Sequence, residues 1–176
     1  MGAHPAPRLS TERLILRGFV AEDFDAIYAY HQHPEVYRFF GPEPIGREEL
    51  WRRTLASVGG WTVNGIGGWM VERRDEGDVI GTVAIFDSLR GKGWDGEAEL
   101  GYIFAAPMHG QGYAGEACRA ALMWFDAERG GDLYAMIDPR NASSHRLAER
   151  LGFAAERRFD YQGEELVLLK RPAPSD

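Results

Sequence analysis

A glycine-rich segment, GQGYAG at residues 110–115, is the part of the chain whose residue types and spacing most directly indicate chemistry. It follows an apolar and aromatic run at 100–104 that is typical of a buried strand. After it, apolar residues recur from Ala114 to Phe125 at helical spacing, until Gly130 ends the pattern. A strand, a glycine turn and a helix in this order direct backbone N–H groups and the positive end of a helix dipole toward one point. That arrangement favours phosphate binding.

The same segment permits two other interpretations. Its glycines could provide only a flexible entry to the helix. It also matches G-x-G-x-x-G, with Asp132 about twenty residues beyond, as in NAD- and NADP-binding folds. That fingerprint belongs to a series of parallel βαβ units with the acid at the far end of the second strand. Here hairpins are predicted on both sides and Asp132 is expected at the near end of its strand, so a dinucleotide site is the second interpretation.

The composition bounds the class of protein. With 176 residues, 44% of them hydrophobic, the chain can fold as one domain with a sizeable core. A net charge of −7 argues against a nucleic-acid partner. The single cysteine, Cys118, excludes an internal disulfide and falls on the apolar helix face, where a small buried hydrophobe is expected. No metal site is predicted, because His31 and His33 lack further ligands at suitable spacing.

Hydrophobic periodicity and turn residues predict the elements that must position the glycine segment. The expected strands are 13–17, 69–73, 79–86, the central strand through 100–104, 133–137, 153–161 and 165–170. The expected helices are 21–31 (ended by Pro34), about 47–57 (ended before Gly59-Gly60), the helix after the glycines, and one opened by Pro139 and Asn141 and ended by Gly152. Strand 133–137 is reached through a helical crossover and should lie parallel to the central strand. The fold class is therefore α+β, with a mostly antiparallel mixed sheet flanked by helices.

Residues 1–10 and 172–176 are predicted to be flexible arms, because both contain prolines and lack periodicity. Residues 11–171 form the expected single domain. No apolar run approaches the length of a membrane span, and the first residues lack the apolar core of a signal peptide. We therefore expect a cytoplasmic location and no membrane partner.

Three motifs then stand in a recognisable order: ELGYIF, HGQGYAGEA and NASSHRLAERLGF. Together they resemble the GNAT acetyltransferases, in particular the branch similar to ribosomal-protein N-terminal acetyltransferases. The resemblance extends from TERLILRGF near the N-terminus to the closing hairpin, and so covers nearly the whole chain. It implies a GNAT-like sheet, splayed at its centre, that binds acetyl-coenzyme A (acetyl-CoA).

The resemblance also implies which residues contact acetyl-CoA. The turn from Gln111 to Gly115 would cradle the pyrophosphate with backbone amides, and the central strand would part from its parallel neighbour to admit the pantetheine arm. His109, where this branch often has tryptophan, would line the rim without a catalytic role. The expected contacts are Tyr102, Ile103, Phe104, His109, Gly110, Gln111, Gly112, Tyr113, Ala114, Gly115, Asn141 and Ser144.

Two side chains are candidates for catalysis by the same resemblance. Glu99 matches the family's acidic position for a general base; its alternative role is a strand-end carboxylate or ion pair. Ser144 would hydrogen-bond the departing thiolate, because Ala148 stands where many members have tyrosine. The alternative role of Ser144 is helix capping, for which Asn141 is the expected residue. A backbone N–H near residues 101–103 would stabilise the charge on the carbonyl oxygen.

The resemblance therefore implies an N-acetyltransferase that moves an acetyl group from acetyl-CoA to a primary amine by direct transfer in a ternary complex. The acceptor is either a protein N-terminus or a small-molecule amine. Its selectivity would come from residues 31–46, from 88–96 and from the last hairpin. The alternatives are the NAD- or NADP-binding protein and an acyl-CoA-binding sensor without catalysis. A homodimer through the sheet edge is compatible with the sequence, although no motif indicates it.

Overall fold

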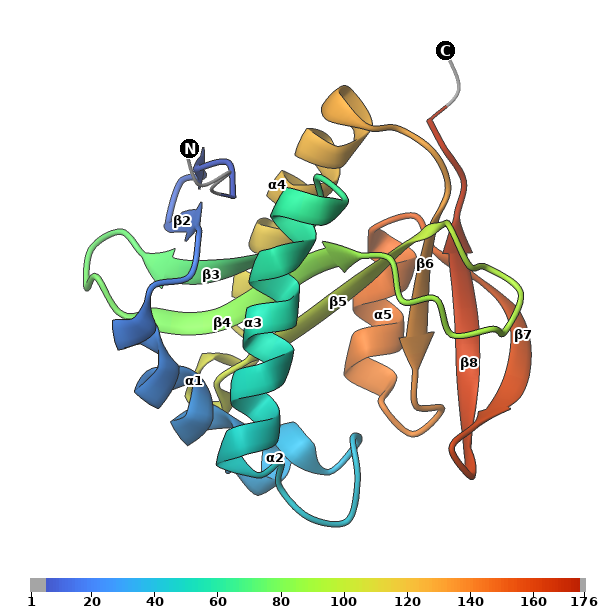
Figure 1. The fold of residues 1–176 in the computed structure, drawn as a ribbon, viewed down its shortest axis with the longest axis horizontal. Coiled ribbons are helices and arrows are strands. Elements are labelled where there is room, and N and C mark those ends of the chain that lie inside the picture. The colour runs from blue at the N-terminus through green and yellow to red at the C-terminus, as the bar shows by residue number, and fades with distance from the viewer. Residues whose placement is uncertain (1–5, 175–176) are drawn as a thin grey trace.

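The computed structural model describes residues 6–174 (Figure 1). Within them, eight strands form one sheet in the order β1-β2-β3-β4-β5-β6-β8-β7, and every neighbouring pair except β5 and β6 is antiparallel. The strands are β1 (Leu9–Ser10), β2 (Leu14–Arg17), β3 (Gly68–Arg73), β4 (Val79–Phe86), β5 (Ala98–Phe104), β6 (Leu133–Ile137), β7 (Ala154–Tyr161) and β8 (Glu164–Arg171). The expected α+β fold with one parallel crossover is confirmed.

Helices cover both faces of this sheet, with α3 in front and α4 behind in Figure 1. The helices are η1 (Ala21–Asp23), α1 (Phe24–His31), α2 (Pro34–Tyr37), α3 (Arg47–Val63), η2 (Ala106–Met108), α4 (Tyr113–Glu128) and α5 (Ala142–Arg150). The main core joins the sheet to α4 and α5, and a smaller cluster joins it to α1 and α3. Cys118 is fully buried in the main core, and this burial raises the pKa of its thiol. Its expected role as a buried hydrophobe is confirmed.

Helix α3 is longer than its sequence predicts. It continues through Gly59 and Gly60 to Val63 and ends where Gly65 adopts a φ of +67°. The reason is tertiary, because a Cβ at Gly60 would lie 2.6 Å from the carbonyl oxygen of Ile66. Gly60 therefore permits a close approach between the helix and the chain that follows it, and the prediction that the glycines end the helix is wrong.

The segment after α1 also differs from its prediction. Helix α1 ends at His31 as expected, but Pro34 does more than prevent its continuation. It begins the short helix α2, whose first turn is capped by the His33 side chain accepting from the Glu35 N–H. Proline suits this first position, because the N–H it lacks would have no partner inside the helix.

The predicted N-terminal arm is partly wrong. Residues 1–5 lie outside the described residues, but Leu9 and Ser10 pair with β2 and Ala6 is buried. The indole N–H of Trp69 donates to the Pro7 carbonyl at 2.8 Å. These residues are held because β2 would otherwise leave a row of backbone groups unpaired at the sheet edge. At the other end, residues 175–176 are outside the described range, and the Ala173 N–H donates to Asp132.

Candidate active site

Strands β5 and β6 pair only at their beginnings. The register contains Ala98 with Leu133 and Glu99 with Tyr134, although β5 continues to Phe104 and β6 to Ile137. Figure 1 shows the two strands running apart beyond these pairs, with α5 beside the opening. On the other side, β5 pairs with β4 from Glu99 to Phe104, and β6 pairs with β8 along its whole length. The expected splay of the sheet is confirmed.

The backbone of Tyr102 faces the opening between β5 and β6. The Ala105 N–H donates to the Ile80 carbonyl on β4 at 2.9 Å. Successive residues of a strand direct their backbone groups to opposite sides, so Ile103 and Gly101 also face β4. The N–H and C=O of Tyr102 therefore face the side that β6 has left, where an extended ligand can supply their partners.

The glycine-rich turn delivers free backbone N–H groups at the end of β5. Gly110 and Gly112 have φ values of +73° and +81°, in the left-handed region that favours glycine. Gly112 is the N-cap of α4, and its carbonyl accepts from the N–H of Glu116. The N–H groups of residues 113–115 precede the first intrahelical bond, so they are available to an anion at the positive end of the helix dipole.

Gly115 lies inside the first turn of α4 and is buried. A Cβ at this position would lie 3.4 Å from Leu147 of α5. The glycine therefore brings the start of α4 close to α5, in addition to its expected place beside the ligand.

Two residues predicted to contact acetyl-CoA, His109 and Gln111, use their side chains to stabilise the turn. The His109 Nε2 is 2.9 Å from the Phe104 carbonyl, and the Gln111 side-chain amide donates to the Pro107 carbonyl at 2.7 Å. Both side chains are therefore engaged within the segment that joins β5 to α4. Their remaining contribution to ligand binding would come from the backbone.

The start of α5 lies across the opening from the glycine-rich turn. The Asn141 side chain accepts from the Ser144 N–H at 3.1 Å, which confirms Asn141 as the helix cap. The Ser144 hydroxyl takes no part in this capping bond. The Tyr102 hydroxyl donates to the Ser144 carbonyl at 3.2 Å, and burial raises the pKa of Tyr102 to about 12. The structure thus brings Tyr102, Asn141 and Ser144 together.

Glu99 lies at the other end of β5 and is 4% exposed. Both its carboxylate oxygens accept from Arg90, each at 3.0 Å, and the Trp94 indole N–H is 3.4 Å away. The remaining arm of Arg90 donates to the Tyr161 hydroxyl at 2.7 Å. The ion-pair role of Glu99 is therefore realised, and its role as a base stays a prediction.

Loop 88–96 packs against strands β6 and β7 through Trp94. Trp94 stacks on Tyr134 of β6 with ring centroids 6.1 Å apart, and meets Phe159 of β7 edge-on at 5.3 Å. The loop and the last hairpin therefore form one packed group around Glu99. These are two of the three segments expected to govern acceptor selectivity.

Sequence reasoning missed two groups of residues in these regions. Arg90 and Tyr161 complete the surroundings of Glu99, and Thr11 with Arg13 contacts the first turn of α4. A carboxylate on a buried strand signals that some cation must accompany it. That signal does not specify which arginine, because the partner comes from a loop of no fixed geometry.

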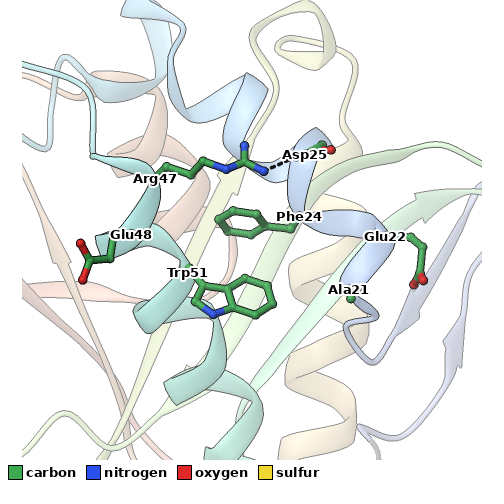
Figure 2. A pocket seen from close by; sticks show the side chains of 7 residues that line it. All are labelled: Ala21, Glu22, Phe24, Asp25, Arg47, Glu48 and Trp51. Carbon is green, nitrogen blue, oxygen red and sulfur yellow. Dashed lines mark hydrogen bonds and ion pairs between the residues drawn. The ribbon is translucent and has the colours of Figure 1, made fainter.

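A pocket of about 600 Å³ opens between η1, α1 and the first turns of α3 (Figure 2). Phe24 and Trp51 meet edge-on inside it with centroids 4.9 Å apart, and Arg47 forms an ion pair with Asp25 at 2.6 Å. Among the described residues that line it, none belongs to β5, β6 or the glycine-rich turn. The pocket is therefore separate from the opening in the sheet.

The dinucleotide interpretation lacks its structural context. The single parallel pair is surrounded by antiparallel strands, and Asp132 stands before β6, as expected, where it forms an ion pair with Lys170 at 2.6 Å. Within residues 6–174, no group of three His, Cys, Asp or Glu side chains could hold a metal ion. No helix in the same range is both long and apolar enough to cross a membrane.

An α+β sheet that opens between two parallel strands, beside a glycine-rich helix start, defines the acyltransferase class that the sequence motifs imply. Comparison with known proteins makes the assignment specific. The model of the acetyltransferase (GNAT) domain matches residues 13–154, and the chain belongs to this family of N-acetyltransferases. An N-acetyltransferase of Bacillus subtilis (strain 168), named YoaA and itself uncharacterized, is 31% identical over 161 residues, which cover 89% of each chain.

Solved structures agree with this assignment. A Bordetella pertussis protein described as a GNAT-family acetyltransferase superposes with a TM-score of 0.82 at 27% identity, covering 94% of this chain and 99% of that one. The ribosomal-protein-S5-alanine acetyltransferase of Vibrio fischeri superposes with a TM-score of 0.71, covering 95% and 97% of the two chains. Its identity is only 20%, so this likeness concerns the fold alone.

Proposed function

We propose that the protein transfers an acetyl group from acetyl-CoA to a primary amine, either a protein N-terminus or a small molecule. The observation that carries the proposal is the opening between β5 and β6, which leads directly to the glycine-rich start of α4. An extended amide-containing arm fits the unpaired edge of β5, and a pyrophosphate fits the free N–H groups of residues 113–115. Both requirements are met by one molecule, the donor that the GNAT family uses.

Acetyl-CoA supplies a thioester whose carbonyl carbon is attacked by the neutral amine in a complex of all three partners. The Tyr102 N–H faces the opening and is our candidate donor to the carbonyl oxygen as negative charge develops there. Ser144, at the start of α5, is the proposed hydrogen-bond donor to the departing thiolate. Cys118 is not proposed as an intermediate acyl carrier, because it is fully buried in the core.

Glu99 is the proposed acceptor of the proton that the amine loses. Arg90 donates one bond to each carboxylate oxygen, and Oε1 keeps a second lone pair, so the amine or a bridging water would reach Glu99 beside Arg90. Arg90 also donates to the Tyr161 hydroxyl. Loop 88–96 is therefore proposed to contribute to the acceptor site, since it carries the cation that lies against Glu99.

The acceptor remains a choice between two classes. The resemblance to ribosomal-protein N-terminal acetyltransferases supports a protein N-terminus, and the variety of acceptors in the family supports small amines equally. A panel of N-terminal peptides and small primary amines distinguishes them by the release of free coenzyme A thiol. Binding of acetyl-CoA without turnover on this panel would favour the acyl-CoA sensor.

Thermal unfolding with acetyl-CoA, coenzyme A, NAD and NADP tests the donor assignment. A ligand at one hundred times its Kd stabilises the folded state by about 2.7 kcal/mol. For a chain of this size, that corresponds to an increase in Tm of roughly 5–10 °C. We expect this shift with the two coenzyme A species alone. A shift with NAD or NADP alone would replace the proposal with the dinucleotide interpretation.

A further inference from the structure

Glu116, in the first turn of α4, is held by the segment that precedes β2. Its Oε1 accepts from the Thr11 hydroxyl at 2.6 Å and from the Arg13 backbone N–H at 2.9 Å. Its Oε2 accepts from the Arg13 Nε at 2.7 Å. The carboxylate thus receives three bonds from residues about a hundred positions away in the chain.

The guanidinium of Arg13 extends from this carboxylate to the glycine-rich turn. Its Nη1 donates to the Gln111 carbonyl at 3.0 Å, and its Cζ lies 4.3 Å from the centre of the Tyr113 ring. A Cβ at Gly112 would lie 3.4 Å from its Nη2. One side chain therefore contacts the turn on both sides of Gly112 while it remains fixed to the helix.

The bond to the Gln111 carbonyl sets the direction of the next N–H. In a trans peptide the C=O and the following N–H point in opposite directions. Because the Gln111 carbonyl is directed at Arg13, the Gly112 N–H points away from Arg13. A left-handed glycine turn has few steric constraints of its own, so this external bond decides which way the peptide faces.

Charge gives Arg13 a second effect at the same place. Glu116 lies in the first turn of α4, the end of the helix that would meet an anionic ligand, and an unpaired carboxylate there would repel a phosphate. The Arg13 guanidinium neutralises it in place. Loss of Arg13 would therefore release the turn and also leave a negative charge beside the anion site.

We propose that Arg13 is a positioning residue for donor binding, with Glu116 as its anchor. Together they hold the glycine-rich turn with its N–H groups toward the pyrophosphate of the donor and keep the helix start free of net negative charge. This inference rests on the proposed function, because it specifies how the proposed donor site is assembled. It also assigns a role to the N-terminal TERL motif, which is distant in sequence from the site.

The test is a set of four variants, Arg13→Ala, Arg13→Lys, Glu116→Gln and the double variant Arg13→Ala/Glu116→Gln. The Kd for acetyl-CoA is measured by calorimetry. Arg13→Ala should raise the Kd about tenfold, the effect of losing one charge-assisted bond. Arg13→Lys should give an intermediate Kd, because one ammonium cannot span Glu116 and the turn as the guanidinium fork does.

The double variant separates the proposal from simple destabilisation. Removing the carboxylate also removes the repulsion, so the double variant should bind within about threefold of the wild type, tighter than Arg13→Ala alone. Glu116→Gln alone should raise the Kd about threefold, because the amide oxygen can still accept a bond from Arg13 but the charge-assisted anchor is lost. A double-variant Kd at or above that of Arg13→Ala would overturn the proposal.

A matched control and a truncated donor complete the experiment. Arg52→Ala removes an exposed arginine paired with Glu48 on α3, away from the turn, and should leave the Kd unchanged. Acetyl-pantetheine lacks the pyrophosphate, so Arg13→Ala should not alter the thermal shift that it produces. An equal loss for both donors would overturn the proposal. If wild-type protein fails to bind acetyl-CoA, the proposed function itself is wrong; if it binds and Arg13→Ala binds equally well, only this inference is wrong.

Discussion

The two ends of β5 carry regions of opposite construction. At the Phe104 end, the glycine-rich turn and the start of α4 present backbone N–H groups from one continuous stretch of chain. At the Ala98 end, Glu99 is surrounded by side chains that arrive from loop 88–96 and from β7. The first region depends on the local backbone conformation of the turn. The second depends on charged and polar side chains that come from separate segments of the chain.

The proposed function would give the two ends of β5 different chemical tasks. A pyrophosphate is recognised by any well-directed set of N–H groups, so the turn would need small residues and the correct conformation. Proton transfer needs a particular carboxylate in a controlled environment, so the Glu99 region would need specific partners. Substitutions near Glu99 should therefore change stability and kcat, whereas substitutions in the turn should change the Kd for acetyl-CoA.

The largest effect on stability is expected at the Glu99 end. Arg90→Ala would leave a buried carboxylate without its cation and should lower the free energy of unfolding by about 3 kcal/mol. Urea unfolding measures this loss. As a control, Arg158→Ala removes an exposed pair with Glu165 and should cost less than about 1 kcal/mol. Equal losses in the two variants would show that burial of the Glu99–Arg90 pair does not increase its effect on the free energy of unfolding.

The next effect concerns turnover. Glu99→Gln should lower kcat about 100-fold at neutral pH, the contribution of a general base, and leave the Kd for acetyl-CoA within about twofold. The control Glu97→Gln changes an exposed carboxylate just before β5 and should leave kcat unaltered. If the wild type and Glu99→Gln have equal kcat at every pH tested, Glu99 is not the base and its role is confined to the ion pair.

A substitution in the glycine-rich turn, at the Phe104 end of β5, should weaken the binding of acetyl-CoA. Gly112→Val places a branched side chain at a φ of +81° with its Cβ toward Arg13, and should raise the Kd for acetyl-CoA about 30-fold. Gly77→Val is matched, because Gly77 has a φ of +74° in the hairpin between β3 and β4 with open space around it. Calorimetry should show loss of affinity in the first variant alone. An equal Kd in both would mean that the turn does not contact the donor.

The contrast between the two ends also explains what the sequence could predict. Strands β4 and β6 have the bounds that alternation and turn residues predict, because each lies between clear local signals. The glycine-rich turn also has a local signal, its glycines. The glycines of α3 do not, because their role depends on the approach of Ile66, a contact that no periodicity encodes.

Partners that meet through folding had no comparable signal. Arg90 and Glu99 are nine positions apart across a loop, and Arg13 and Glu116 are 103 apart. The chain contains twenty Lys and Arg residues and twenty-seven Asp and Glu residues, so opposite charge alone selects no pair. Most of the elements and the glycine-rich turn could therefore be predicted, whereas the residues that hold Glu99 and Glu116 could not.

The smallest effect tests whether the turn end also depends on a charge. Partial burial disfavours the ionised form of Glu116, but hydrogen bonds from Thr11 and Arg13 outweigh it and keep the pKa of this carboxyl below its usual value. A lowered pKa in the folded state stabilises the protein above the ordinary glutamate pKa, and this contribution is lost as the pH falls through the folded-state value. The Tm advantage of the wild type over Glu116→Gln should therefore shrink on titration from about pH 7 to about pH 3.

The half-exposed Arg13 limits that advantage to less than about 1 kcal/mol, so it should be visible in Tm but small beside the effect of Arg90→Ala. Acetyl-CoA binding should respond to the same titration, because protonated Glu116 no longer anchors Arg13. A constant difference in Tm across the range would mean that Glu116 contributes through shape alone. In that case only backbone conformation would determine the properties of the glycine-rich turn, and charge would matter only around Glu99.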